Sequence, residues 1–329
     1  MSATSPGAMK PGWQFWVDRG GTFTDIIARK PDGSFEITKL LSENPGVYED
    51  AALAGIERLM KDADHAIYDP SQISDVRIGT TVATNALLEH KGAPTLFVVT
   101  KGFADLLRIG RQSRPDIFAL NIRKPDPLYD MVREVEARLS LDGEWLAPLD
   151  VEAARRMFSD ARQAGAQSCA IAMMNAWKFP DLEQFLGELA REVGFSHVTL
   201  SHQADPLVGY VARAATGVAD AYLSPVLHQY VHQVRQALGM APLRFMQSNG
   251  GLAEADSFQG KDAVLSGPAG GVVGSARSAL ALGHDRVIGF DMGGTSTDIS
   301  VYEGAFERVT EAEVAGTPLR VPMMDIHTV

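Results

Sequence analysis

Two nearly identical segments carry the residues best suited to chemistry. Residues 18–26 read Asp-Arg-Gly-Gly-Thr-Phe-Thr-Asp-Ile and residues 291–299 read Asp-Met-Gly-Gly-Thr-Ser-Thr-Asp-Ile, so seven of nine positions are identical. Each segment follows a short apolar run and precedes alternating residues, a turn and another strand-like run, ending near residues 40 and 309. This pattern predicts two consecutive hairpins whose first turn is Gly-Gly-Thr. Repeats this far apart favour two similar domains that face each other, not a short-period solenoid.

The repeated segment has the chemistry of a phosphate and metal site. Paired glycines allow a positive φ and a close backbone approach, and successive N–H groups can then form an anion-binding nest. Asp18 and Asp291 would stand at strand ends beside such nests, where a carboxylate repels phosphate unless Mg²⁺ lies between them. A single copy would indicate no more than a hairpin turn, but two copies indicate paired phosphate clamps. The predicted phosphate donors are Gly20, Gly21, Thr22, Thr24, Gly293, Gly294, Thr295 and Thr297.

Two further segments place small and polar residues where a helix is expected to start. Residues 79–86, Gly-Thr-Thr-Val-Ala-Thr-Asn-Ala, join a predicted strand at 76–79 to a predicted helix at 82–90. Helix N-termini attract anions and polar groups, but Thr80 or Thr81 could equally be a plain cap. Residues 266–275, Ser-Gly-Pro-Ala-Gly-Gly-Val-Val-Gly-Ser, lead into a predicted small-residue helix at 270–282 and match no standard nucleotide loop. Ligand contact and tight helix packing are both open there.

The elements that must position these motifs alternate between strand and helix, which indicates α/β layers. Strands are predicted at 95–99, 168–174 and 198–201, and helices at 151–164 and 180–193. A long helical pattern at 207–238 is predicted to be interrupted at Pro225. We expect a disordered tail over residues 1–12, a first domain over 13–203 with the first phosphate motif, and a second domain over 204–329 with the second.

Composition excludes several classes of protein. The net charge of 30 − 41 = −11 argues against a nucleic-acid-binding surface. Cys169 is the single cysteine, so the chain has no internal disulfide framework, as is typical of a reducing compartment. No apolar run approaches the roughly 18 residues of a membrane span, and the first 12 residues lack the apolar core of a signal peptide. The sequence therefore predicts a cytoplasmic protein without nucleic-acid or membrane partners.

These segments resemble the hydantoinase A/oxoprolinase family, and within it the 5-oxoprolinases. The duplicated hairpins also resemble the phosphate motifs of the actin, sugar-kinase and chaperone ATPase superfamily. The similarity covers about residues 12–329 and implies a duplicated α/β fold with two domains around a nucleotide cleft. The segments that carry it are residues 17–25, 39–43, 79–89, 220–225, 248–252, 265–272 and 289–298.

The resemblance implies an ATP-dependent cyclic-amide hydrolase. In that family ATP phosphorylates the lactam oxygen of 5-oxo-L-proline, and ring opening gives L-glutamate, ADP and phosphate. The implied cofactors are ATP and Mg²⁺, with Asp18 and Asp291 orienting the metal through water as metal and catalytic residues. Thr80, Thr81 and Asn85 are the candidates for the substrate side. A B-type hydantoinase domain or subunit would complete hydrolysis, and we expect a homo-oligomer.

Other members of the family share these motifs, so the substrate stays open. An N-methylhydantoinase would act on a hydantoin, and the ATPase subunit of an acetone- or acetophenone-type carboxylase on a ketone. A non-catalytic nucleotide switch, as among actins and chaperones, is the alternative outside enzymes. In the superfamily an adenosine-binding segment follows the second phosphate motif, whereas only residues 299–329 follow Asp298 here. We therefore expect an N-terminal fragment whose second domain is truncated and exposes apolar strand faces.

Overall fold

A six-stranded sheet carries the first motif. The computed structural model describes residues 12–64, 67–111, 118–121, 124–292 and 297–328. In this sheet β1 (Trp13–Arg19), β2 (Phe23–Arg29) and β3 (Phe35–Leu41) form an antiparallel meander. β4 (Ile73–Thr80) and β11 (Leu243–Met246) extend it in parallel to β1, and β12 (Leu252–Glu254) closes the edge. The two consecutive hairpins predicted from residue 18 onward are confirmed.

The two faces of this sheet differ in their cover. Phe15 and Ile26 are buried on the face that packs against α1 (Ala51–Asp64). The helix lies close, because a Cβ at Gly55 would fall 2.0 Å from Ile26 Cδ1. Alternation of side chains along the strands places Asp18 on the opposite face. There the outer strands expose large apolar side chains, namely Phe23, Ile27, Phe35, Ile37 and Leu41.

A second lobe contains the parallel sheet β10-β9-β5-β6. Its strands are β5 (Thr95–Thr100), β6 (Met131–Val135), β9 (Ser168–Ala172) and β10 (His197–Leu200), and its main helices are α4 (Val151–Gln163) and α5 (Asp181–Glu192). Other short elements of the chain are α2 (Val82–Leu88), α3 (Leu106–Ile109), β7 (Arg138–Leu139), β8 (Trp145–Ala147) and α6 (Ser201–Ala204). Three 3₁₀ turns, at Pro70–Gln72, Ala255–Ser257 and Gly260–Asp262, precede β4 or follow β12 of the first sheet. The predicted alternation of strand and helix is thus confirmed.

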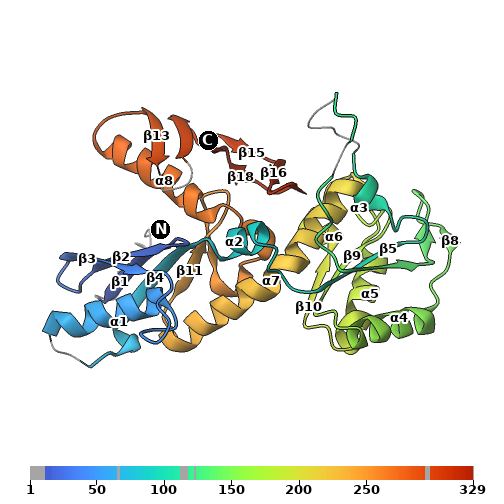
Figure 1. Cartoon of the computed structure of the whole chain (residues 1–329), viewed down its shortest axis with the longest axis horizontal. Helices are drawn as coiled ribbons and strands as arrows, with labels where there is room; N and C mark the ends of the chain where they lie inside the picture. Colours follow the sequence, from blue (N-terminus) through green and yellow to red (C-terminus); the bar gives the residue numbers. More distant parts are fainter. Residues whose placement is uncertain (1–11, 65–66, 112–117, 122–123, 293–296, 329) are drawn as a thin grey trace, which may run out of the picture.

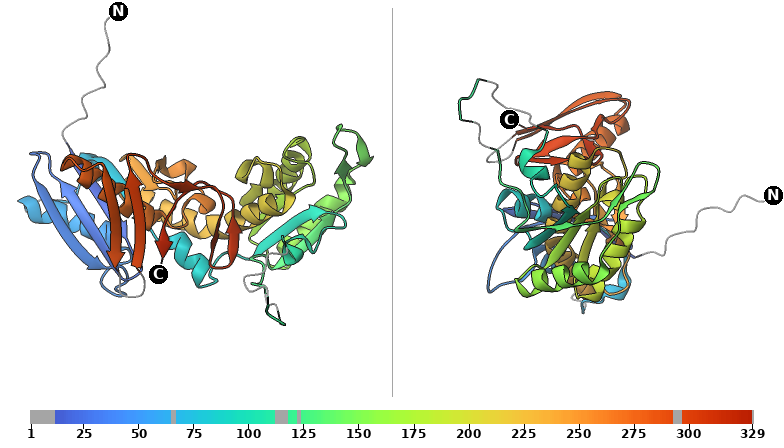
Figure 2. Two further views of the ribbon diagram at one scale, coloured as in Figure 1. Left: turned by 90° about the horizontal axis from the view of Figure 1, so that it is seen from above. Right: turned by 90° about the vertical axis from the view of Figure 1, so that its right-hand side faces the viewer.

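Helix α7 (Tyr210–Leu238) runs through both lobes without a break (Figure 1, Figure 2). The interruption predicted at Pro225 is therefore wrong. Segments that cross the helix bond to it near the proline: the Ala93 N–H donates to the Tyr222 carbonyl and the Gly260 N–H to Ser224 Oγ. These contacts hold the helix where proline removes a backbone donor.

The expected domain boundary at 203/204 falls within α6, before its last residue, and ahead of α7. Strands β11 and β12 come after this point in the chain, yet they belong to the same sheet as β1 to β4. The division into 13–203 and 204–329 stays a prediction. Residues 1–11 of the predicted tail lie outside the described residues.

The second motif lies on a smaller sheet. Helix α8 (Ser266–Ala281) begins four residues earlier than predicted and leads to the antiparallel pair β13 (Arg286–Met292) and β14 (Thr297–Glu303). The other neighbour of β14 is β19 (His327–Thr328), whereas β15 (Arg308–Val309) pairs with β18 (Met323–Met324). A further hairpin is formed by β16 (Ala312–Val314) and β17 (Thr317–Leu319).

The second consecutive hairpin predicted for this copy is therefore wrong. The chain turns at Gly304 and makes a single bridge between Tyr302 and Phe306, and Phe306 then packs against the cluster that joins α8 to Met324. The expected exposure of apolar strand faces is confirmed, since Ile288, Phe290 and Met292 of β13 are 69%, 63% and 70% exposed. Within the described part of the chain, no helix is both long enough and apolar enough to cross a bilayer.

Candidate functional site

Three chain segments meet around the carboxylate of Asp18. Asp18 ends β1 and lies opposite Gly79, near the end of β4. A Cβ at Gly79 would fall 3.6 Å from Asp18 Oδ1, and a Cβ at Gly267, in the first turn of α8, 3.9 Å from the same atom. The site is thus built from the ends of two adjacent parallel strands and the start of a helix.

Backbone and side-chain bonds shape the turn that follows Asp18. The Gly20 N–H donates to the Phe23 carbonyl at 3.0 Å, while Ser42 donates its hydroxyl to the Gly20 carbonyl at 2.7 Å and its N–H to the Thr22 carbonyl at 2.9 Å. Among the described residues, no hydrogen bond uses the N–H of Gly21 or of Thr22. The nest predicted from Gly20 and Gly21 therefore has free amides at residues 21 and 22, because the amide of Gly20 closes the turn.

The two glycines of this turn differ in how much room a side chain would have. Neither Gly20 nor Gly21 has a positive φ, so the left-handed backbone expected from the sequence is absent at these two positions. A Cβ at Gly20 would lie 3.0 Å from the Phe23 carbonyl oxygen, which is tight. A Cβ at Gly21 would lie 3.6 Å from Asn85 Nδ2, an ordinary contact, so the side chain missing there leaves room beside the cleft.

Thr22 and Thr24 point to different surroundings. Thr22 is exposed, whereas Thr24 is fully buried and its Oγ1 lies 3.0 Å from Ser42 Oγ. Thr24 supports the turn from the α1 side and does not reach the cleft, which corrects the expectation that its hydroxyl binds phosphate directly. Ser42 was not singled out as a site residue, although it belongs to the 39–43 segment that carries the family resemblance.

The three substrate-side candidates gather at the start of α2, next to this turn. Thr80 is buried and its Oγ1 accepts the Val82 N–H at 3.2 Å, which is a capping role. Thr81 donates its hydroxyl to the Arg19 carbonyl at 3.2 Å, and Asn85 Nδ2 donates to Thr81 Oγ1 at 3.3 Å. Thr81 and Asn85 thus tie α2 to the end of β1, and the Asn85 amide faces Gly21.

The second hairpin repeats the register of the first. Asp291 pairs with Asp298 across β13 and β14, as Asp18 pairs with Asp25 across β1 and β2. Asp291 is exposed and Thr297 is half-buried. Gly293, Gly294 and Thr295, the other predicted phosphate donors of this copy, lie outside the described residues.

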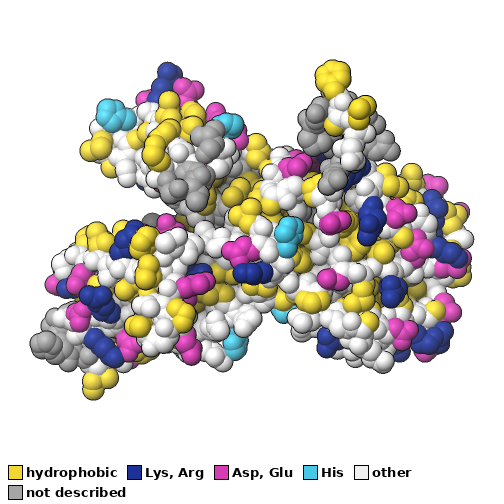
Figure 3. All heavy atoms as spheres, viewed as in Figure 1, with side chains coloured by type: hydrophobic (Ala, Val, Ile, Leu, Met, Phe, Trp, Pro, Cys, Tyr) yellow, Lys and Arg dark blue, Asp and Glu magenta, His cyan; other side chains and the backbone are white. Residues whose placement is uncertain are grey.

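The charge of Asp291 acts on Asp18. Burial raises the pKa of Asp18, the negative charges of Asp25 and Asp291 raise it further, and Lys39 opposes them. The Asp18 side chain is still exposed. Figure 3 shows the surface indented by a cleft between the part that contains β13 and the part that contains β1 to β3. Asp18 and Asp291, one from each repeated segment, are therefore close enough for their charges to interact. Within the described residues, no group of three or more His, Cys, Asp or Glu side chains suits a metal ion.

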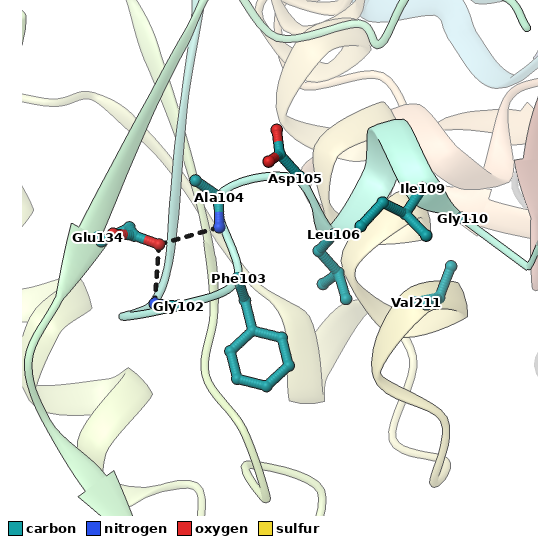
Figure 4. Close-up of a pocket in the computed structure, with 9 residues that line it drawn as sticks. All are labelled: Gly102, Phe103, Ala104, Asp105, Leu106, Ile109, Gly110, Glu134 and Val211. Atoms are coloured by element: carbon teal, nitrogen blue, oxygen red, sulfur yellow. Dashed lines mark hydrogen bonds between the residues drawn. The ribbon is translucent and has the colours of Figure 1, made fainter.

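Two pockets lie away from this cleft, on either side of α3. One of about 500 Å³ is lined by the loop from Gly102 to Gly110 and by Glu134, whose carboxylate accepts the N–H groups of Gly102 and Ala104 (Figure 4). The other, of about 170 Å³, lies between α7 and the β16–β17 hairpin. Neither is lined by any site residue predicted from the sequence.

Comparisons with known families match almost the whole chain. Residues 14–194 match the hydantoinase/oxoprolinase N-terminal region, and residues 213–329 match the hydantoinase/oxoprolinase family. The chain is 43% identical to 5-oxoprolinase 1 of Arabidopsis thaliana over 96% of its own length, and 40% identical to 5-oxoprolinase of Saccharomyces cerevisiae over 95%. It spans only 27% and 28% of the length of these two relatives.

Two solved structures share the fold. The ATP-dependent caprolactamase from Pseudomonas jessenii superposes with a TM-score of 0.82 at 28% identity, covering 96% of this chain and 48% of that one. A nucleotide-free acetone carboxylase superposes with a TM-score of 0.81 at 23% identity, covering 96% and 47%. The fold class expected from the sequence, an α/β fold of the actin-like, two-domain type, is confirmed.

Proposed function

Because the chain belongs to the hydantoinase/oxoprolinase family, we propose that it is the nucleotide-binding part of an enzyme that opens cyclic amides at the expense of ATP. One observation carries the proposal. Two hairpins of nearly identical sequence hold their aspartates in the same register, and Asp291 lies near enough to Asp18 for its charge to help raise the pKa of Asp18. Two such turns can hold a chain of phosphates from opposite sides.

The proposed chemistry is a phosphoryl transfer. The lactam oxygen attacks the γ-phosphorus of ATP and ADP leaves. Phosphorylation makes the ring carbon a better electrophile, one water adds to it, and the C–N bond breaks to leave the ring nitrogen as an amine and the former carbonyl as an acyl phosphate. A second water hydrolyses the acyl phosphate to the carboxylate and phosphate. Overall, ATP, the lactam and two waters give the amino acid, ADP and phosphate. Such a transfer depends on positioning and charge neutralisation more than on a nucleophilic side chain.

The chain's own groups would do the positioning. The free amides of Gly21 and Thr22 and the exposed Thr22 hydroxyl are the donors of the first turn, with Ser42 and Thr24 holding that turn from behind. The second turn would act in the same way through Gly293, Gly294, Thr295 and Thr297. Thr81 and Asn85 would face the amide substrate, and Thr80 would cap α2.

A magnesium ion fits this donor set. Mg²⁺ keeps several waters and is usually held by one or two carboxylates together with substrate phosphates. Asp18 and Asp291 offer two carboxylates at an open cleft, and the mutual repulsion that raises the pKa of Asp18 would be relieved by a cation. Asp18 and Asp291 would hold the ion through water, and its charge would neutralise the phosphate oxygens.

5-Oxo-L-proline is the substrate that we propose. Relatives from a plant and a yeast that are at least 40% identical are named 5-oxoprolinase. The fold shared with an acetone carboxylase supports a second candidate, an ATPase subunit that activates a ketone. We further propose a B-type hydantoinase partner, since a relative 31% identical is named the alpha subunit of caprolactamase. A homo-oligomer in the cytoplasm completes the proposal, in keeping with the lone buried Cys169.

Substrate-dependent ADP release by the enzyme that contains this chain tests the function. We expect ADP to appear faster with 5-oxo-L-proline than with ATP alone, and the new carboxylate of the ring-opened product to carry label from H₂¹⁸O. Stimulation by acetone and bicarbonate without any response to cyclic amides would favour the carboxylase. Polymerisation driven by nucleotide, with no stimulation by either substrate class, would contradict both enzymatic readings.

A further inference from the structure

Helix α8 carries the second hairpin. β13 follows α8 in the chain and packs against it, so that a Cβ at Gly289 would lie 3.5 Å from Ser275 Oγ. On its other side α8 contacts β4 and β11 of the first sheet (Figure 1). Further along the helix, a Cβ at Gly271 or Gly274 would meet nothing within 4 Å. The direction in which α8 leaves the first sheet therefore decides where Asp291 lies relative to Asp18.

That direction is set at a corner formed by Leu265 and Ser266. Leu265 has a φ of 58°, a left-handed conformation that is disfavoured for a bulky side chain and persists only where the surroundings enforce it. Its N–H donates to Thr84 Oγ1 at 2.9 Å. The hydroxyl of Ser266 donates to the Thr80 carbonyl at 2.9 Å. Both bonds run to the segment that also contains Thr81 and Asn85.

The chain that enters this corner is fixed as well. The Lys261 N–H donates to Asp220 Oδ1 at 3.0 Å, and Ser248 Oγ lies 2.7 Å from the Asp262 carbonyl and 2.6 Å from the Val264 carbonyl. Thr84 is 8% exposed and Ser266 is fully buried, so water does not replace their bonds at low cost. The corner is thus held by two side-chain hydroxyls at the start of α8, with a fixed segment behind it.

We propose that Thr84 and Ser266 are positioning residues that fix the angle of α8, and with it the separation of the two Asp-Gly-Gly-Thr hairpins. They touch neither phosphate nor substrate and act through the helix that carries β13. The relevance of this separation to phosphoryl transfer rests on the proposed function. The geometric claim needs no nucleotide and can be tested on this chain.

Paired spin labels measure the separation directly. Cys169 is the only cysteine and is buried, so labels attach to introduced cysteines at exposed positions. Ile37→Cys places one label on β3 of the first sheet, and Ala305→Cys places the other just beyond the end of β14 in the smaller sheet. In this background Thr84→Val removes the hydroxyl that accepts the Leu265 N–H, with little change in side-chain shape, whereas Thr84→Ser keeps that hydroxyl. Ser266→Ala removes the hydroxyl that donates to the Thr80 carbonyl. Thr216→Val is the matched control, because buried Thr216 accepts the Arg320 N–H at 3.0 Å elsewhere in the fold.

We expect Thr84→Val and Ser266→Ala to broaden and shift the distance distribution, and Thr84→Ser and Thr216→Val to keep that of the parent. An unchanged distribution in a folded Thr84→Val or Ser266→Ala protein would overturn the proposal, and so would equal broadening in Thr216→Val. Should Thr84→Val fail to fold, Ser266→Ala decides alone. Absence of amide-dependent ADP release in the unsubstituted enzyme would refute the proposed function and leave this distance result standing.

Discussion

The two Asp-Gly-Gly-Thr hairpins have the same register but different surroundings. In the first, β2 is flanked by β1 and by β3 along its whole length, and Phe15, Ile26 and Ala28 are at most 1% exposed. In the second, β14 has β13 on one side and only two residue pairs with β19 on the other. Its partner strand β13 leaves Phe290 63% exposed. The repeated sequence therefore specifies the pairing of the flanking strands, while the neighbouring elements decide how deeply those strands are buried.

This comparison separates two kinds of residue within the motif. Asp18 and Asp291 occupy equivalent places near strand ends, and the charge of Asp291 acts on Asp18. Thr24 and Thr297 also occupy equivalent places in sequence, yet Thr24 is fully buried and Thr297 is half-buried. We therefore expect the aspartates to be functionally equivalent and the second threonines to differ.

The largest effect is expected from the aspartates. Asp18→Asn and Asp291→Asn should each lower amide-dependent ADP release by about 100-fold, as for groups that orient a metal through water, while leaving the fold intact. Steady-state ADP release at saturating Mg²⁺ measures the loss, and circular dichroism checks the fold. Full activity in either variant would break the proposed equivalence of the two hairpins.

Alanine substitutions at Gly21 and Gly33 distinguish a phosphate-binding turn from an ordinary hairpin turn. A Cβ at Gly21 meets only Asn85 Nδ2 at 3.6 Å, so Gly21→Ala should keep its stability but weaken ATP binding about tenfold or more by crowding an amide that contacts charged phosphate. Gly33, in the β2–β3 turn, has a φ of +90°, so Gly33→Ala should cost about 1–2 kcal/mol of stability and leave binding unchanged. Calorimetric titration with ATP and urea unfolding measure the two effects. The same loss of binding in both variants would reduce Gly-Gly-Thr to a hairpin turn.

The threonine pair sharpens the contrast between the hairpins. Thr24→Val removes the hydroxyl beside Ser42 and should cost about 1 kcal/mol of stability with little change in activity. No hydrogen bond of the Thr297 side chain is found among the described residues, so Thr297→Val should change stability by less than about 0.5 kcal/mol and lower activity more than Thr24→Val does. Chemical denaturation and ADP release measured on both variants test whether the stability loss is larger for Thr24→Val and the activity loss larger for Thr297→Val. Equal stability losses would mean that the second hairpin is as well packed as the first.

Much of the fold could be predicted because it depends on local patterns. The alternation of apolar and polar residues, together with the turn residues, predicts β1 to β3. Pro180 predicts the start of α5 and Gly194 predicts its end. Pro225 misled, because α7 is held there by Ala93 and Gly260 from distant parts of the chain. The predicted second hairpin of the second motif was wrong for a similar reason, because β15 pairs with β18 from further along the chain. In both cases tertiary contacts override a local signal.

The candidate site could be predicted in composition but not in detail. The repeat identified Asp18 and Asp291, and the structure brings them near enough for the charge of Asp291 to raise the pKa of Asp18. The sequence could not show that the amide of Gly20 closes the turn, that Thr24 points away from the cleft, or that Ser42 supports Gly20. These facts depend on the register of β3 against β2 and on the cover of α1, which no single motif encodes.

The smallest effect concerns stability and follows from the raised pKa of Asp18. Burial and the charges of Asp25 and Asp291 disfavour the ionised form, so the folded protein binds a proton more tightly than the unfolded chain, whose Asp pKa is about 3.9. As the pH rises from that value through the raised pKa, the free energy of unfolding falls, and the penalty stays constant above it. Asp18→Asn carries no charge, so it should melt at a higher temperature than the parent near neutral pH, and this advantage should shrink as the pH falls through the raised pKa toward about 4. Asp291→Asn removes only one of the charges that raise the pKa of Asp18, so its melting temperature should rise less than that of Asp18→Asn. Thermal melts over this pH range, without nucleotide or Mg²⁺, measure both variants. A parent protein as stable at neutral pH as Asp18→Asn would show that the two hairpins do not repel each other across the cleft.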